Sequence, residues 1–140
     1  IGGEGNGGVI YPPLHYGRDA LIGIALFLSQ LAKSRLSCSK LKEAYPQYHI
    51  SKNKIVLSPE TKIDNIFAMI KKEHEMTAEK IYTIDGLRLD FAGEWVHLRK
   101  SNTELIIRIY AESATKEKAD KLAKRFIDRI NNLLNSKKIN

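Results

Sequence analysis

The sequence has a single cysteine and no long apolar run, and each shortage excludes a class of protein. One cysteine among 140 residues cannot build an internal disulfide framework or a multi-cysteine zinc site. No run approaches the roughly 18 apolar residues of a membrane span, so no membrane partner is expected. The lone Cys38 is typical of a reducing compartment. We therefore expect a cytoplasmic protein.

Charge of one sign is not concentrated in any part of the chain. Lys and Arg number 23 and Asp and Glu 16, a net charge of +7. Residues 1–44, 45–111 and 112–140 contribute +2, +1 and +4 to it, without a dense basic run. Nucleic acid is therefore not expected as a partner. The alternative interpretation is a small basic α+β module that binds nucleic acid or serves as an interaction module.

From residue 46 onward the pattern is that of a complete α+β domain. Ser58 and Pro59 indicate the start of a helix, with the serine as its cap and the proline in its first turn. Apolar spacing predicts this helix and a closing helix over 115–135. Asp85-Gly86 indicates a hairpin. Strand-like runs cover 47–57, 80–85, 87–91, 94–99 and 105–111. We expect an antiparallel sheet of four strands with helices on one face.

Residues 1–45 follow a different pattern. Five glycines within residues 2–8 predict a loop, and residues 18–33 predict a helix that is apolar on almost every side. Such a segment cannot enclose a core of its own. We expect it to be the end of an α/β domain from a longer chain. Left alone, helix 18–33 is expected to pack against a second copy, to swap between copies or to be poorly ordered.

Two polar stretches could carry chemistry. Residues 99–104 (RKSNTE) offer a guanidinium, two hydroxyls and an amide between two strands, which suits a phosphate group. Composition alone also fits a solvated hairpin loop. Glu4 lies among glycines that allow close backbone approach, as in sugar recognition, or else belongs to a flexible end. No spacing of the four histidines suggests a metal site.

Together, these stretches carry a resemblance to a known family. Residues 2–8 (GGEGNGG), continued by residues 16–19 (YGRD), resemble the sugar-recognition loop and following helix of the α-D-phosphohexomutases. Residues 99–104 resemble that family's phosphate-binding loop, and residues 45–46 and 51–54 its connection between the third and fourth domains. The two loops lie in the family's order, about 95 residues apart. The nearest subgroups are phosphoglucomutase/phosphomannomutase and phosphoglucosamine mutase.

The resemblance implies a four-domain enzyme that moves phosphate between C1 and C6 of a hexose phosphate. It implies a phosphoserine in the first domain, Mg²⁺ in the second and a hexose bisphosphate activator. Residues 1–45 would be the remnant of the third domain and residues 46–140 the fourth. The N-terminal domains would be partners, and this piece alone would have no catalytic or metal-binding residue and no activity.

The resemblance also assigns residues to the substrate. Glu4 and Asn6 would contact sugar hydroxyls. The phosphate that is not reacting would be held by Arg99, Ser101, Asn102 and Thr103. Three positions depart from the family pattern: Asn6 replaces the usual Ser, Gly8 the usual His, and Leu105 the usual Pro. We expect Leu105 to leave the exit of the phosphate loop freer than a proline would.

Overall fold

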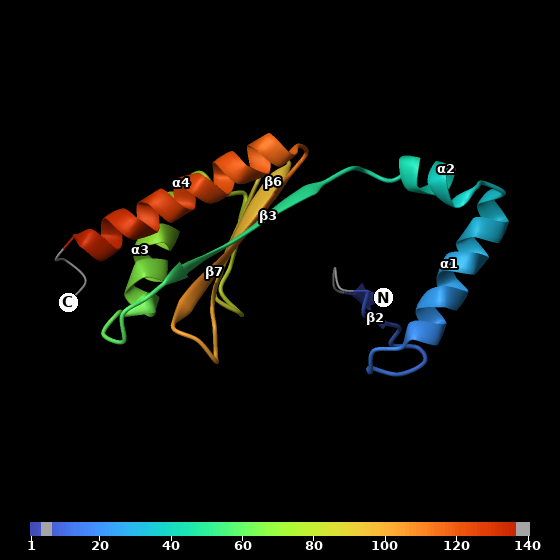
Figure 1. The fold of residues 1–140 in the computed structure, drawn as a ribbon, viewed down its shortest axis with the longest axis horizontal. Coiled ribbons are helices and arrows are strands. Elements are labelled where there is room, and N and C mark those ends of the chain that lie inside the picture. The colour runs from blue at the N-terminus through green and yellow to red at the C-terminus, as the bar shows by residue number, and fades with distance from the viewer. Residues whose placement is uncertain (4–6, 137–140) are drawn as a thin grey trace. The chain divides into compact units, whose positions relative to one another are not determined.

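The chain forms two compact units, residues 1–46 and 47–140 (Figure 1). This computed structural model describes residues 1–3 and 7–136. No helix in these described ranges is long and apolar enough to cross a membrane.

The second unit is built on one antiparallel sheet. Its strands are β3 (His49–Val56), β4 (Lys80–Tyr82), β5 (Leu87–Phe91), β6 (Glu94–Lys100) and β7 (Ile106–Ser113). They lie in the order β3-β7-β6-β5-β4. The α+β prediction is confirmed, but the predicted number of four strands is wrong. The sheet has five, because even the three residues of β4 satisfy their backbone groups by pairing with β5 across a hairpin.

Strand β3 is continuous through its polar residues 51–54. Two of these side chains, Ser51 and Asn53, make hydrogen bonds on the face that the closing helix covers. The Ser51 hydroxyl donates to Asp120 of the closing helix at 2.6 Å, and the Asn53 amide donates to Ser51 at 3.1 Å. Lys52 and Lys54 alternate with them and lie on the opposite face of the sheet. Side chains that alternate between the two faces are typical of a strand, even where none of them is apolar.

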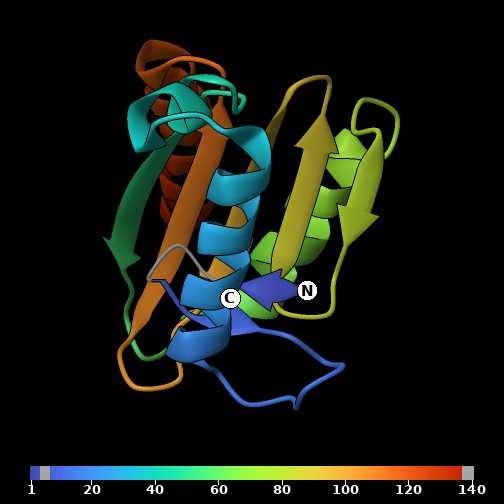
Figure 2. The ribbon, with the colours of Figure 1, turned by 90° about the vertical axis from the view of Figure 1, so that its right-hand side faces the viewer.

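Helices α3 (Ile63–His74) and α4 (Lys116–Asn135) cover the same face of the sheet (Figures 1 and 2). Phe126 of α4 and Ile66 and Ile70 of α3 are fully buried there with the inward residues of the strands. The expectation that Pro59 lies in the first turn of α3 is wrong. Ser58 and Thr61 instead close a turn, with a backbone hydrogen bond of 3.1 Å, before the helix begins.

An ion pair joins the exposed sides of the two helices. The Arg129 guanidinium donates to both carboxylate oxygens of Glu73. Hydrogen bonding to this cation holds the pKa of Glu73 below its ordinary value, although partial burial acts in the opposite direction. Since both side chains are partly exposed, the pair contributes about 0.2–1 kcal/mol.

The first unit contains helices α1 (Ala20–Ser34) and α2 (Cys38–Glu43) and the short strands β1 (Gly2–Gly3) and β2 (Val9–Ile10). The predicted helix is confirmed within two residues. The predicted glycine loop is shorter than expected, because Gly2 and Gly3 pair with Ile10 and Val9. Among the described residues of this unit, only Leu41 is a buried apolar side chain.

Candidate phosphate-binding site

The loop between β6 and β7 is held by backbone hydrogen bonds at both of its ends. The Ser101 amide donates to the Ile106 carbonyl at 3.1 Å and closes the loop on itself. The Leu105 carbonyl accepts from the Leu57 amide at 2.8 Å, which joins the loop to the end of β3. The predicted phosphate residues therefore lie on a loop fixed to the sheet.

Ser101 organises this loop from the inside. Its side chain is buried, with a residue exposure of 8%. Its hydroxyl oxygen accepts from the backbone N–H groups of Thr103 at 3.4 Å and Glu104 at 3.3 Å, and lies 3.4 Å from the Thr103 hydroxyl. Asn102 and Thr103 are exposed. Asn102 and Thr103 are thus open to solvent, whereas Ser101 is buried within the loop.

Leu105 lies in a tight turn that a proline would also fit. The Ile106 amide donates to the Glu104 carbonyl at 2.9 Å, which makes a three-residue turn centred on Leu105. Leu105 has a negative φ, since Arg35 is the only described non-glycine residue with a positive one. In this form of turn the central φ is close to the value that proline imposes. The exit of the loop is therefore not freer for having a leucine.

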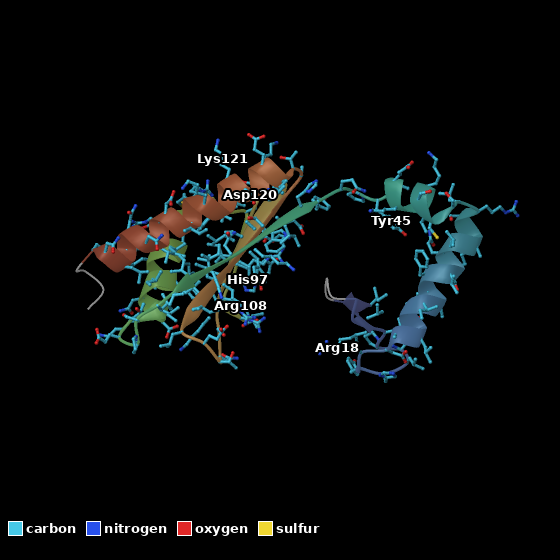
Figure 3. The ribbon with its side chains drawn as sticks, viewed as in Figure 1. Arg18, Tyr45, His97, Arg108, Asp120 and Lys121 are labelled. Carbon is cyan, nitrogen blue, oxygen red and sulfur yellow. The ribbon has the colours of Figure 1, made fainter. Side chains whose placement is uncertain are left out.

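Three cations form a row across the open face of the sheet beside this loop. Arg108 of β7 is the cross-strand partner of Arg99 on β6 and of Lys54 on β3. Figure 3 shows Arg108 and His97 on the side of the sheet away from α4. Like charges placed directly opposite each other destabilise a sheet. An anion over the row would remove that cost.

The sequence interpretation identified Arg99 in this row but missed Arg108. A hairpin with its turn at residues 101–105 would have shown it. The strands on either side of such a turn pair with each other, which places Arg99 opposite Arg108. That step needs the register of β6 and β7, which composition does not supply.

Two carboxylates neutralise the row only partly. Asp85 Oδ2 lies 2.8 Å from Arg99 Nε, and Glu104 Oε2 lies 4.0 Å from an Arg108 terminal nitrogen. Within the described ranges, Lys54 has no carboxylate partner. Arg99 and Arg108 are at least two-fifths exposed, and Lys54 is exposed on an edge strand. A ligand can therefore reach the remaining positive charge.

A shallow pocket of about 390 Å³ lies beside Arg108. Its lining includes Lys52, Lys54, Tyr110 and Glu104. The pocket volume falls in the range of small-molecule sites, about 300–1,000 Å³. Three cations and one carboxylate in this lining suit a small anionic ligand rather than an apolar one.

Other predicted site residues are not brought into this arrangement. Glu4 and Asn6 lie outside the described residues. Nearby, Gly7 has a φ of 87°. No group of three or more His, Cys, Asp or Glu in residues 1–3 and 7–136 is placed to hold a metal ion. These residues therefore do not fit a Mg²⁺ site, and no step through that ion is derived for this chain.

A family model and related sequences identify the same family for this chain. Residues 53–129 match the family model described as phosphoglucomutase/phosphomannomutase, C-terminal domain. A phosphoglucosamine/phosphogalactosamine mutase of Sulfurisphaera tokodaii is 37% identical over 86% of this chain and 27% of its own length. A phosphoglucomutase/phosphomannomutase of Thermococcus kodakarensis is 40% identical over 85% of this chain and 26% of its own. The chain spans about a quarter of these relatives.

Solved structures support the fold. A phosphoglucomutase/phosphomannomutase family protein of Burkholderia thailandensis matches 92% of this chain and 27% of its own, with a TM-score of 0.67 at 22% identity. An Aspergillus fumigatus N-acetylphosphoglucosamine mutase, solved with GlcNAc-6P and magnesium, matches 85% of this chain and 22% of its own, with a TM-score of 0.55 at 18% identity. The match over residues 53–129 and the two sequence relatives confirm the resemblance: the chain belongs to the phosphoglucomutase/phosphomannomutase family and contains its C-terminal domain.

Proposed function

We propose that residues 99–104, together with Arg108, bind the phosphate group of a hexose phosphate. The observation that carries the proposal is the cross-strand pairing of Arg99 with Arg108 beside the loop. Two forked cations can donate hydrogen bonds to several phosphate oxygens, while the exposed Asn102 and Thr103 side chains offer neutral donors. Glu4 and Asn6 are proposed to contact the sugar hydroxyls, on the family resemblance alone.

The proposal extends to the larger enzyme that carries this domain. That enzyme would be a hexose-phosphate mutase, an isomerase that transfers phosphate from a phosphoserine to the sugar and back, with Mg²⁺ bound by another domain and a hexose bisphosphate as activator. The relatives named as mutases and the structure with GlcNAc-6P and magnesium support this. Here the loop would hold the distal phosphate and so orient the sugar for transfer elsewhere. The 140-residue chain alone is proposed to be inactive.

The test is a titration of the 140-residue chain with glucose 6-phosphate, followed by amide NMR. We expect saturable shifts confined to residues 99–108, similar shifts with inorganic phosphate and none with glucose. Arg99→Ala should weaken binding at least about tenfold, because a hydrogen bond to a charged group contributes about 1.5–3 kcal/mol.

The matched control is Arg88→Ala, which removes the same charge from the same face of the sheet. Arg88 lies over the Trp95 ring, 4.5 Å from its centroid, and away from the loop. Its loss should leave phosphate affinity nearly unchanged. An absence of shifts in residues 99–108 at millimolar glucose 6-phosphate, or an equal effect of both arginine variants, would contradict the proposal.

A further inference from the structure

The turn between β4 and β5 lies against the strand that enters the phosphate loop. Asp85 in this turn makes two contacts with β6. The His97 Nε2 atom lies 2.6 Å from the Asp85 backbone carbonyl, and Arg99 Nε lies 2.8 Å from the Asp85 carboxylate. His97 and Arg99 are two residues apart and lie on the same open face of the sheet.

Gly86 explains how the turn comes so close to β6. Its φ of 84° lies in the left-handed region, and a Cβ atom there would overlap the carbonyl oxygen of Leu98. Only glycine permits this contact between backbones. The Asp85 carboxylate is therefore carried by a backbone segment that is packed directly on the residue preceding Arg99.

A single carboxylate cannot occupy the whole guanidinium of Arg99. The contact recorded for Asp85 is with Nε, and among the described residues no other carboxylate is paired with Arg99. A guanidinium binds two phosphate oxygens through a pair of neighbouring nitrogens. A carboxylate on the Nε side can thus fix the orientation of the group while its outer edge remains free for a ligand.

We infer that Asp85 is a positioning residue that holds the Arg99 guanidinium in the orientation that binds phosphate. The inference rests on the proposed function of the loop and adds a residue that neither the loop sequence nor the predicted site contains. An exposed arginine loses much rotamer freedom when it binds a ligand. Because Asp85 already restricts Arg99 in the free protein, less of that freedom is lost on binding.

Neutralising Asp85 should change phosphate affinity in opposite directions, depending on whether Asp85 positions Arg99 or acts only through its charge. Asp85 adds a negative charge beside the phosphate site, so its neutralisation would tighten phosphate binding if only electrostatics mattered. If Asp85 positions Arg99, neutralisation weakens binding instead.

The test compares four forms of the 140-residue chain: wild type, Asp85→Asn, Asp85→Glu and Asp90→Asn. The last is the matched control. Asp90 lies on the same face and pairs at 2.7 Å with Arg88, not with Arg99. The measurements are the glucose 6-phosphate and inorganic phosphate affinities, and the Nε–H signal of Arg99 in NMR relaxation experiments.

We expect Asp85→Asn to weaken both ligands about three- to tenfold, the range that corresponds to ordering one long side chain on binding. The Arg99 Nε–H signal should change from ordered to mobile without a change in melting temperature. Asp85→Glu should restore part of both effects. Asp90→Asn should leave both readouts unchanged or tighten binding slightly.

Two results would be decisive against the inference. If Asp85→Asn binds glucose 6-phosphate as tightly as the wild type, or more tightly, while Arg99→Ala abolishes binding, Asp85 does not position Arg99 and the proposed phosphate site stands. If the wild-type chain binds neither ligand, the proposed site itself fails and the role of Asp85 fails with it.

Discussion

The two units of this chain have equally well-formed helices, but only one has a core. Helix α1 begins at a cap in which Asp19 accepts from the Ile22 amide, and it ends at Arg35 in the left-handed conformation. Helix α4 begins at an equivalent cap, in which Thr115 accepts from the Lys118 amide. Yet no described residue of α1 is buried, whereas six residues of α4 are. Caps and periodicity are enough to define a helix, but burial needs a sheet to pack against.

The comparison separates the two predicted halves of the substrate site. The phosphate loop is fixed to a sheet with a complete core, so residues 47–140 can present it without help from the first unit. The glycine-rich segment of residues 2–8 belongs to a unit with a single buried apolar residue among those described, Leu41. We therefore expect the proposed sugar contacts to depend on packing that residues 1–46 do not supply by themselves.

The sharpest test of this contrast is to truncate one phenylalanine in each unit. Phe126→Ala should lower the free energy of unfolding by about 3–5 kcal/mol, because Phe126 is fully buried in the core. Phe27→Ala should change it by less than about 0.5 kcal/mol, since Phe27 is 45% exposed. The measurement is urea unfolding followed by fluorescence of Trp95, the only tryptophan. A large effect of Phe27→Ala would break the contrast.

A second set of variants compares three glycines with a positive φ. Gly86→Ala should cost about 2–3 kcal/mol, because the new Cβ would overlap the Leu98 backbone and the φ is unfavourable for alanine. A Cβ at Gly7 meets no atom of the described residues within 4 Å, and Gly7→Ala should leave unfolding of the second unit unchanged. Gly93→Ala, in an open turn of the second unit, should cost about 1–2 kcal/mol from φ alone. Thermal unfolding of all three variants tests this order.

Replacing Leu105 by proline should stabilise the second unit slightly. Among the described residues, the Leu105 amide donates no hydrogen bond, and its turn already has a φ near that of proline. Leu105→Pro should therefore raise the free energy of unfolding by about 0.4–1 kcal/mol by restricting the unfolded chain. A loss of stability in denaturant unfolding would show that the turn is not of this form.

The smallest expected effect on unfolding is that of removing the first unit altogether. A shortened chain that begins at Gln47 should keep its free energy of unfolding within about 0.5 kcal/mol, because the core is complete without residues 1–46. Its state of association should change instead. Leu21, Ile24 and Leu28 of α1 are all more than half exposed, so the 140-residue chain should self-associate while the shortened chain stays monomeric. Light scattering over a range of concentrations distinguishes the two.

Much of the fold could be predicted because it depends on local pattern. Apolar spacing placed α4 and identified its buried stripe, and the Asp85-Gly86 pair indicated the hairpin between β4 and β5. The start of α3 was placed too early because Pro59 and a nearby hydroxyl can open a turn as well as a helix. All five strands correspond to predicted strand-like runs, but the sheet was expected to have four strands, because local pattern does not show which runs pair in one sheet.

The candidate site divides in the same way. By its amino acids alone, the sequence predicted a polar stretch at residues 99–104 suited to phosphate and determined the family, although Arg99 and Lys100 of that stretch belong to β6. Only the tertiary structure decided that Ser101 is turned inward, that Arg108 lies opposite Arg99 and that Asp85 contacts Arg99 from another hairpin. The reason is physical: side-chain chemistry is set residue by residue, whereas the distance between groups far apart in the chain is set by strand register and by the packing of one turn on another.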